Sequence, residues 1–535
     1  MSASCTHVAI VGAGFAGTCA LWHLVDRYPV RQITVFEASG AFGPGVPYRE
    51  DDSPHYLINN TTDTMCLASG HRRAFLDWLA AIGHPGAADP QGHLPRAEFG
   101  RFLREVFRAA VASAAIKGIA VRLVPQAVTE IDETLPGRVR LTWAGGETLA
   151  DAVLLATGRC AAAPRVAAPP PGAHACLIPD HLRTPVLDAL PPEATVHVLG
   201  TSLSAYDVVN RLFAPETGAV FVRDAAGTLH FEAGSSARQV VLMSRSGRLK
   251  KVGSATAPAI RRTRLRAAVL AAQAQAQGGL TLADLQALVE AEAAAHGVRL
   301  DWAALAHPYR DCTNAEAVNQ RAGALLAADL AAARQGGAAN FLVELAADAQ
   351  RLLWHVFAAG LLQPEAQRRY RREVETALLC YAAPCPIPTA ERLLALHRAG
   401  RLRVCRGVGT PVLEPDGRAW TVPHAHGAAR ATVLVDASGA LDRRLDSPGQ
   451  PPLYAQAARS GLLRPHAPGG EPAEGIAVDL QTGRAAGTRA VYLAGMMLWG
   501  PAFFTSSAFL TARMVERALA AMFGVPLPLD PGDPA

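Results

Sequence analysis

A glycine-rich turn between a predicted strand and a predicted helix constrains the fold more than any other feature. Residues 8–11 form a short apolar run, which is typical of a buried strand, and Gly12, Gly14 and Gly17 follow it in G-x-G-x-x-G order. The first glycine permits a tight turn, the second lets backbone approach a pyrophosphate, and the third lets the helix pack on the strand. The pattern therefore predicts a dinucleotide site.

The segment after this turn completes a β-α-β unit. Helical periodicity continues over residues 18–28, a second strand is predicted over residues 33–36, and Glu37 stands at its end. A carboxylate at the end of this strand accepts hydrogen bonds from ribose hydroxyls, while amide groups at the helix N-terminus meet the phosphates. Glu37 is thus predicted to bind the cofactor.

A second unit of the same kind begins near residue 196. Its strand ends at Gly200, and Ser202 and Ala205 stand where the second and third glycines are expected. Serine is small enough for a pyrophosphate to approach and adds a hydroxyl donor, so Gly200, Ser202 and Ser204 are candidate contacts for a second nucleotide. A vestigial site is the alternative.

The next strand of the second unit ends in Ser244 and Arg245, where a site for NAD would show an acidic residue. Arg245, with Arg248 or Lys250, is suited to grip a 2′-phosphate, which favours NADPH. An exposed basic loop is the alternative.

Composition limits the class of protein. The 535 residues are enough for two to four domains, half of them are hydrophobic, and a net charge of +5 gives little support for nucleic-acid binding. Nine cysteines without regular spacing argue against a disulfide scaffold. We find no signal peptide and no apolar run long enough to span a bilayer, so we expect a cytoplasmic protein without membrane contact.

The order of the segments predicts four parts and a tail. Prolines between residues 160 and 174 indicate a linker, and Ala- and Leu-rich helical periodicity fills residues 257–400. We expect an α/β protein with two Rossmann-like dinucleotide-binding domains, the first split around the second, and a helical insert. The predicted parts are 1–170 (first domain), 171–256 (second domain), 257–400 (insert), 401–525 (return to both domains and a C-terminal helix) and 526–535 (tail).

Two further strand ends resemble motifs of a known class. Ala156-Thr157-Gly158 and, near the C-terminus, Leu493-Ala494-Gly495 resemble, in that order, the A-T-G and terminal strand-glycine motifs of two-dinucleotide flavoproteins. In that class the FAD domain is split around a nicotinamide domain. The resemblance implies FAD in the first site, contacts from Gly158 and Gly495, and a backbone contact from Val128 to the adenine.

Three more segments narrow the resemblance. Residues 42–48 (FGPGVPY), 56–60 (YLINN) and 94–100 (LPRAEFG) resemble segments of a family of bacterial FAD/NAD(P)-binding proteins related to amino-acid N-hydroxylating monooxygenases. The likeness covers residues 6–250 and 485–515, and the helical insert matches poorly. It implies that Arg96, in the last segment, contacts the cofactor.

What the resemblance implies is an NADPH-consuming monooxygenase. NADPH would reduce FAD, O2 would form a C4a-hydroperoxyflavin, and an oxygen atom would pass to a small nucleophilic substrate, an amine nitrogen first. Asn59 and Asn60 are the candidates that face the flavin, with Trp499, Phe503 and Phe504 as an apolar wall. The insert is expected to select the substrate, and the oligomeric state stays open, a homo-oligomer included.

Two alternatives remain open. One is an NAD(P)H-dependent reductase or dehydrogenase; Cys380 and Cys385 lie in the insert and not beside the first β-α-β unit, which argues against a disulfide acceptor. The other is a non-catalytic flavin-binding redox sensor. His424 and His426 lack accompanying ligands, so no metal site is predicted. The basic run of Arg261, Arg262, Arg264 and Arg266 is interpreted as a solvated helix face, with an anion site as the alternative.

Overall fold

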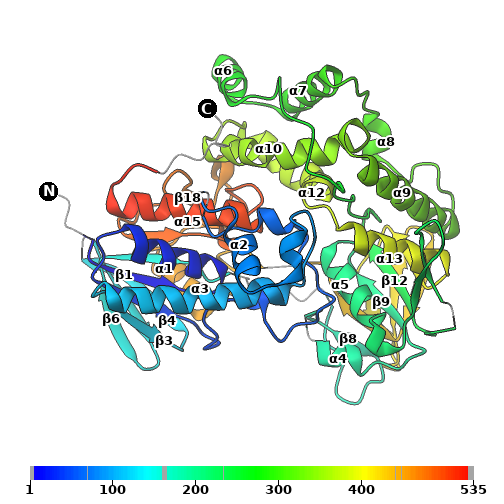
Figure 1. Ribbon diagram of the computed structural model, residues 1–535, viewed down its shortest axis with the longest axis horizontal. Coiled ribbons are helices and arrows are strands. Elements are labelled where there is room, and N and C mark those ends of the chain that lie inside the picture. The colour runs from blue at the N-terminus through cyan, green and yellow to red at the C-terminus, as the bar shows by residue number, and fades with distance from the viewer. Residues whose placement is uncertain are drawn as a thin grey trace.

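The computed structural model describes residues 5–68, 70–135, 137–158, 166–182, 184–232, 234–439, 442–447 and 449–527. Figure 1 shows two α/β lobes side by side and a layer of helices lying across the top of both. Each lobe is built on its own sheet. Of the predicted linker, residues 166–174 contain no helix or strand, and Pro164 lies outside the described residues.

The first lobe holds a seven-stranded sheet in the order β18-β19-β20-β7-β1-β2-β3. Five of its strands, β20-β7-β1-β2-β3, run parallel, and β1 is buried along its whole length. Continuous apolar runs are what a parallel sheet covered on both faces requires. The strands are β1 (His7–Val11), β2 (Gln32–Phe36), β3 (Ala120–Val124), β7 (Ala152–Leu155), β18 (Val478–Asp479), β19 (Arg484–Ala485) and β20 (Val491–Leu493).

Helices and a small antiparallel sheet, β4-β5-β6, both pack against this sheet. Helix α1 (Phe15–Arg27) packs against α3 (Arg96–Ile116) and against the C-terminal α15 (Ala508–Phe523). Helix α14 (Pro452–Arg459) packs on β4 (Val128–Leu135). The chain thus returns to the first lobe after the rest of the fold is complete, and the red helix α15 lies beside the blue helix α1 in Figure 1.

The second lobe holds a five-stranded parallel sheet in the order β13-β12-β9-β17-β8. Helix α5 (Leu203–Leu212) follows β9, and α13 (Ile387–Arg398) precedes β13. The strands are β8 (Cys176–Ile178), β9 (Thr195–Leu199), β12 (Gln239–Ser244), β13 (Leu402–Arg406) and β17 (Val433–Asp436), and a separate pair is β10 (Phe221–Arg223) and β11 (Leu229–Phe231).

The two lobes repeat one topology. The order β7-β1-β2-β3 in the first sheet matches β17-β9-β12-β13 in the second. A three-stranded antiparallel sheet precedes the last strand of each unit, β4-β5-β6 before β7 and β14-β15-β16 before β17. These strands are β5 (Arg138–Trp143), β6 (Gly146–Ala150), β14 (Val412–Leu413), β15 (Trp420–His424) and β16 (Gly427–Ala431). The repeated β-α-β pattern of the sequence therefore extends to the whole of each unit.

The helical layer is inserted between β12 and β13. Its helix α10 contributes Leu352, Trp354 and Phe357 to the core of the first lobe, whereas α9 packs on α13 of the second. The insert is thus fixed to both lobes. Its helices are α6 (Ala267–Gln277), α7 (Leu282–Ala295), α8 (Trp302–Ala306), α9 (Ala315–Gln335), α10 (Phe341–Ala358), α11 (Pro364–Arg369) and α12 (Glu375–Ala382), with a π-helical turn at Tyr370–Val374 between the last two.

The basic run does not lie on a helix face, so that interpretation is wrong. Helix α6 begins at Ala267, and the arginines belong to an extended segment before it. The reason is a buried carboxylate: Glu292 of α7 accepts hydrogen bonds from the backbone N–H groups of Thr263, Arg264 and Leu265, each at 2.7 Å. The backbone N–H groups that a helix would use for its own hydrogen bonds here donate to Glu292 instead.

We predict that Glu292→Gln lowers the free energy of unfolding by about 3 kcal/mol, because the new amide NH2 group would face backbone N–H donors that have no other acceptor. Burial raises the pKa of Glu292, but the hydrogen bonds from Leu265, Thr263 and Arg264 outweigh it and leave the pKa below its usual value. The carboxylate therefore stabilises the fold above the ordinary glutamate pKa of about 4.3, and this contribution is lost as pH falls.

Urea unfolding at neutral and at acidic pH checks this prediction. The matched control is Glu290→Gln on the exposed side of the same helix. We expect the difference between wild type and Glu292→Gln to shrink below about pH 4.3. An equal loss in both variants, or a difference that does not change with pH, would show that Glu292 does not act through its charge.

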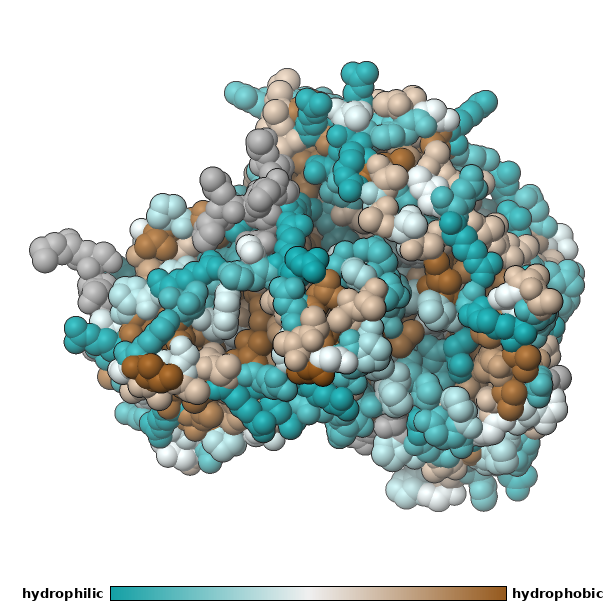
Figure 2. All heavy atoms as spheres, viewed as in Figure 1, coloured by the Kyte–Doolittle hydropathy of each residue, from teal (hydrophilic) through white to brown (hydrophobic). Residues whose placement is uncertain are grey.

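Of the helices in the described part of the chain, none combines the length and the apolar character that a membrane span requires. Figure 2 shows apolar residues scattered among polar ones over the face it presents.

Candidate functional site: two dinucleotide turns

The first glycine turn has a backbone that only glycine fits. Gly12 adopts φ +102°, its N–H donates to Phe36 O at 2.8 Å, and a Cβ on it would clash with Ala156 O. A Cβ on Gly17 would clash with Gly12 O, and one on Gly14 would stand 3.2 Å from Gly45 Cα. The tight turn and the close helix–strand contact that a pyrophosphate cradle needs are therefore both present.

Glu37 lies beside this turn, as predicted from its position. Its carboxylate accepts from the Ala13 N–H at 2.9 Å, and its own N–H donates to Val124 O at 3.0 Å. Val128 is paired with Trp143, whose ring contacts Phe36 at 5.1 Å between centroids. Glu37, at the end of β2, thus lies close to the start of β4, where Val128 stands.

Gly158 and Gly495 come together because β7 and β20 are parallel neighbours. Both have positive φ, +71° and +103°. Ala156 N–H donates to Val11 O at 2.8 Å and Ala494 N–H to Leu155 O at 3.1 Å, so both segments join the edge where β1 ends in Gly12. Four glycines predicted from three motifs, Gly12, Gly14, Gly158 and Gly495, line one edge, which fits a bound dinucleotide.

Asn59 and Asn60 lie on a segment that pairs with the start of α3. Ile58 N–H donates to Leu94 O at 2.9 Å, and His93 Nδ1 lies 3.0 Å from Ile58 O and 3.1 Å from Asn60 O. Asn60 Nδ2 lies 3.9 Å from Met65 Sδ. Both asparagines are half-buried, and within the described residues the Asn59 side chain has no hydrogen bond. Their contact with a flavin remains a prediction.

Arg96 has partners that differ from the predicted cofactor contact. Its Nη2 lies 2.5 Å from Asp207 Oδ2 in α5, its Nε donates to Leu57 O at 3.3 Å, and its guanidinium lies 5.7 Å from the Tyr56 ring centroid. Burial raises the pKa of Asp207 to about 6, against the opposing effect of Arg96. Arg96 therefore links the two lobes, which gives it a positioning role.

The second glycine turn repeats the first in detail. Gly200 adopts φ +131°, its N–H donates to Met243 O at 2.7 Å, and a Cβ on it would clash with Ala437 O. Ser202 is the N-cap residue of α5 and is exposed, and no hydrogen bond from its side chain caps the helix. Ser204 is half-buried in the first turn of α5. Both hydroxyls are placed where a pyrophosphate would approach the helix.

Strand register aligns Ser244 with Glu37. Phe36 pairs with Val11, Met243 pairs with Leu199, and the next residues are Glu37 and Ser244. The Ser244 hydroxyl lies 3.0 Å from Thr201 Oγ1 and accepts from Gly247 N–H at 2.9 Å. A serine thus stands in the second unit at the position that matches Glu37 in the first, and a site for NAD would have a carboxylate there.

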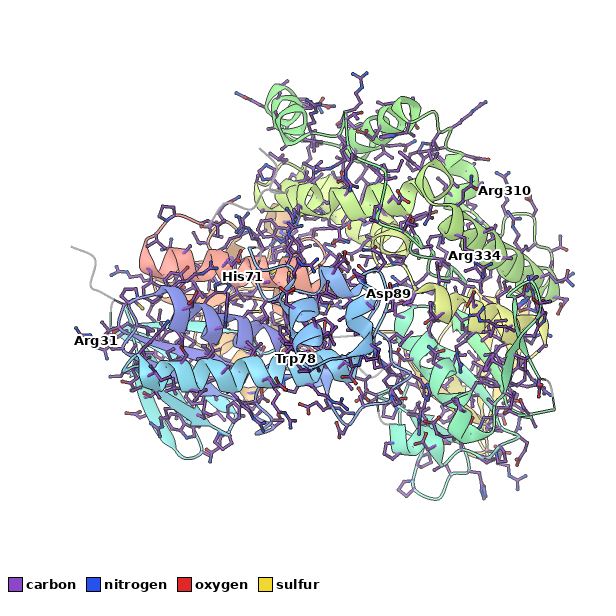
Figure 3. All side chains as sticks on the ribbon, viewed as in Figure 1. Arg31, His71, Trp78, Asp89, Arg310 and Arg334 are labelled. Atoms are coloured by element: carbon purple, nitrogen blue, oxygen red, sulfur yellow. The ribbon has the colours of Figure 1, made fainter. Side chains whose placement is uncertain are left out.

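Arg245 lines a cavity of about 290 Å3 that we name the arginine pocket. Lys250, an alternative candidate, does not line it, because its ammonium is buried and donates to Leu379 O at 2.6 Å. Figure 3 labels Arg310 on the insert, above the second lobe. The residues of the pocket are Arg245, Ser246, Arg248, Ala306, His307, Pro308, Tyr309, Arg310 and Arg406.

The predicted aromatic wall is held by insert residues that the sequence did not single out. Arg371, on the π-helical turn, donates to Gly500 O at 2.8 Å and to Ala502 O at 2.6 Å, and it pairs with Glu375. Glu375 also accepts from Trp499 Nε1 at 3.3 Å. A π-helical turn within a helix often marks a functional position. In this segment the turn is the local feature that points to Arg371.

Trp499, Phe503 and Phe504 are all buried. Phe503 stacks on Phe357 of α10 at 6.1 Å, and Trp499 lies under the guanidinium of Arg443 at 4.4 Å. Phe504 has φ +49°, which is rare for a residue with a side chain. The segment after Gly495 is thus tightly fixed between the insert and the first lobe. Ser507 accepts from Leu510 N–H at 3.4 Å and caps α15.

Within the described residues, no group of three or more His, Cys, Asp or Glu side chains is arranged to hold a metal ion.

Residues 9–160 match a family model described as FAD-NAD(P)-binding, which confirms the predicted dinucleotide-binding domain and the relation to that class. No curated protein matches the chain in sequence.

Three solved structures resemble the fold over almost the whole chain, and they confirm the predicted fold class. L-lysine 6-monooxygenase from Pseudomonas syringae has a TM-score of 0.54 at 14% identity, covering 96% of this chain and 98% of that one. The ornithine N-hydroxylase of Kutzneria sp. 744 has 0.52 at 15%, covering 97% and 99%. A cadaverine monooxygenase from Erwinia amylovora has 0.55 at 11%, covering 99% and 97%.

Proposed function

We propose that this protein is an FAD-dependent, NADPH-consuming monooxygenase that N-hydroxylates a small amine or amino acid. The observation that carries the proposal is the pair of dinucleotide turns, the first with the carboxylate of Glu37 at the end of its next strand and the second with Ser244 and Arg245 at the matching position. One unit suits FAD and the other NADPH. The three structural relatives are named as amine or amino-acid monooxygenases, and one was solved with reduced FAD, NADP+ and L-ornithine.

Bound FAD would supply the transfer of electrons from NADPH to O2. Gly12, Gly14 and Glu37 would hold its pyrophosphate and ribose, with Val128, Gly158 and Gly495 along the same edge of the sheet. Gly200, Ser202, Ser204, Ser244 and Arg245 would hold NADPH. Arg96 would keep the two lobes in register through Asp207, which sits two turns or fewer from Ser202 on α5.

The remaining roles concern the reacting end. Asn59 and Asn60 would orient the flavin or the substrate, since Asn59 has a free amide in the described structure and Asn60 has only a weak contact with Met65. Trp499 and Phe504 would exclude water, because Arg371 and Glu375 hold their segment in place. Exclusion of water favours oxygen transfer over loss of peroxide.

The test measures three quantities on the flavin-loaded protein: NADPH oxidation, O2 uptake and hydroxylamine product. We expect a primary amine such as lysine, ornithine or cadaverine to raise NADPH oxidation at least tenfold and to yield one hydroxylamine per O2. Substrate-independent electron transfer to a dye, without hydroxylamine, would support a reductase instead. Absence of flavin reduction by NADPH or NADH, with every amine, would support a non-catalytic flavin-binding protein.

A further inference from the structure

A loop of the helical insert is fixed over the nucleotide edge of the second lobe. This segment, residues 306–310, comprises the last residue of α8 and the first part of the connection to α9. Tyr309 is buried and its hydroxyl donates to Gly247 O at 2.7 Å, and Arg248 donates to Ala306 O from the other side. Gly247 lies directly after the segment Ser244–Ser246 that ends β12. The loop therefore forms one wall of the arginine pocket in a fixed position.

The pocket carries positive charge from three separate parts of the chain. Arg245 and Arg248 follow β12, Arg310 comes from the insert loop, and Arg406 ends β13, where it is paired with Ser244. No carboxylate is among the residues that line the pocket. The nearest acidic partner is Asp311, whose side chain is 90% exposed and lies 3.5 Å from Arg310 Nε.

Arg406 gives a second indication that an anion belongs in the arginine pocket. Its Nε is buried, and within the described residues it has no hydrogen-bond acceptor. A buried guanidinium N–H without an acceptor costs free energy, and arginines placed side by side repel one another. A bound dianion removes both costs, because a phosphate offers three acceptor oxygens to several guanidinium groups.

We infer that the helical insert completes a 2′-phosphate site, in which Arg310 of the insert and Arg406 of β13 join Arg245 in gripping the phosphate of NADPH. The inference rests on the proposed function for the identity of the dinucleotide. It assigns to part of the insert the selection of the cofactor, whereas the sequence pointed only to selection of the substrate. Because a hydrogen bond holds the loop against Gly247, side chains of both the second lobe and the insert would contact the phosphate.

Binding of two nucleotides that do not react tests the inference. Calorimetric titration of the flavin-loaded protein compares adenosine 2′,5′-bisphosphate with adenosine 5′-monophosphate, which lacks the 2′-phosphate. We expect Arg310→Gln and Arg406→Gln each to weaken the bisphosphate at least tenfold and to change the monophosphate less than twofold. The matched control is Arg299→Gln, an exposed arginine of the insert that does not line the pocket.

The outcomes separate this inference from the proposed function. Equal weakening of both nucleotides, or unchanged binding of the bisphosphate, overturns the 2′-phosphate site whatever the enzyme does. Selective weakening supports it even when no amine is hydroxylated, since no turnover is measured. Flavin content and the melting temperature show whether the Arg406→Gln protein is folded. If it is not, the result for Arg310→Gln decides whether the site exists, because that variant changes an exposed side chain.

The variant Tyr309→Phe tests whether the insert loop, which forms one wall of the arginine pocket, has to be held in place. The variant loses only the hydrogen bond to Gly247 O. If the insert loop positions Arg310, the preference for the bisphosphate over the monophosphate falls by about two- to twelvefold, as the loss of one hydrogen bond predicts. An unchanged preference, with Arg310→Gln still defective, would show that the loop does not need this anchor and would contradict the positioning role of Tyr309.

Discussion

Gly12→Ala is expected to yield protein with less than about a tenth of the flavin bound by wild type. The backbone at Gly12 has φ +102°, and a Cβ there clashes with Ala156 O, which belongs to the neighbouring strand end. A residue with a side chain held in such a conformation costs about 1–3 kcal/mol, and the clash must in addition push β1 and β7 apart at their carboxyl ends. That edge is where Gly14, Gly158 and Gly495 would meet the same cofactor.

Flavin absorbance per protein, before and after incubation with excess FAD, measures the effect. Gly234→Ala is the control, because nothing lies within 4 Å of the added Cβ and its φ is unrestrictive. Circular dichroism and urea unfolding establish that the variant is folded. A folded Gly12→Ala protein with one flavin per chain would show that the first turn is not the FAD site.

Local motifs were predictable from the sequence because the residues that define them are neighbours in the chain. Gly12, Gly14 and Gly17 lie within six residues, and Glu37 ends the next strand of the same β-α-β unit. Gly158 and Gly495 were predicted from the resemblance of their segments to two-dinucleotide flavoproteins, and parallel pairing of β7 with β20 brings them together. Strand ends in parallel sheets meet at one edge, so correct strands suffice to predict a shared site.

The contacts of the insert were not predictable in this way. Tyr309 contacts Gly247 across 62 residues of sequence, and Arg96 reaches Asp207 across 111. Helical periodicity indicates which face of a helix is apolar but not which neighbour it packs against, so the arginine pocket could not be assembled from Arg245 alone. The prediction that the basic run lies on a helix face was wrong for a related reason. Glu292, from a different helix, determines the backbone conformation of this run.

The second glycine turn allows a matching experiment at Gly200. Unlike Gly12→Ala, the variant is expected to keep its flavin. In Gly200→Ala the added Cβ clashes with Ala437 O, and the φ of +131° is again rarely adopted by a residue with a side chain. Because Gly200 belongs to the second sheet, FAD binding should stay within twofold of wild type. Reduction of the flavin by NADPH should slow at least tenfold, since the helix N-terminus that would meet the pyrophosphate is displaced.

Stopped-flow reduction under anaerobic conditions checks this, with dithionite as the reductant that needs no nucleotide site. We expect dithionite to reduce the flavin of Gly200→Ala and of wild type at equal rates. If Gly200→Ala is also flavin-free, the two lobes do not bind their nucleotides independently, and the Arg96–Asp207 contact becomes the first candidate for the coupling. If NADPH reduces the variant at the wild-type rate, the second turn is vestigial, and the hydride donor must bind elsewhere.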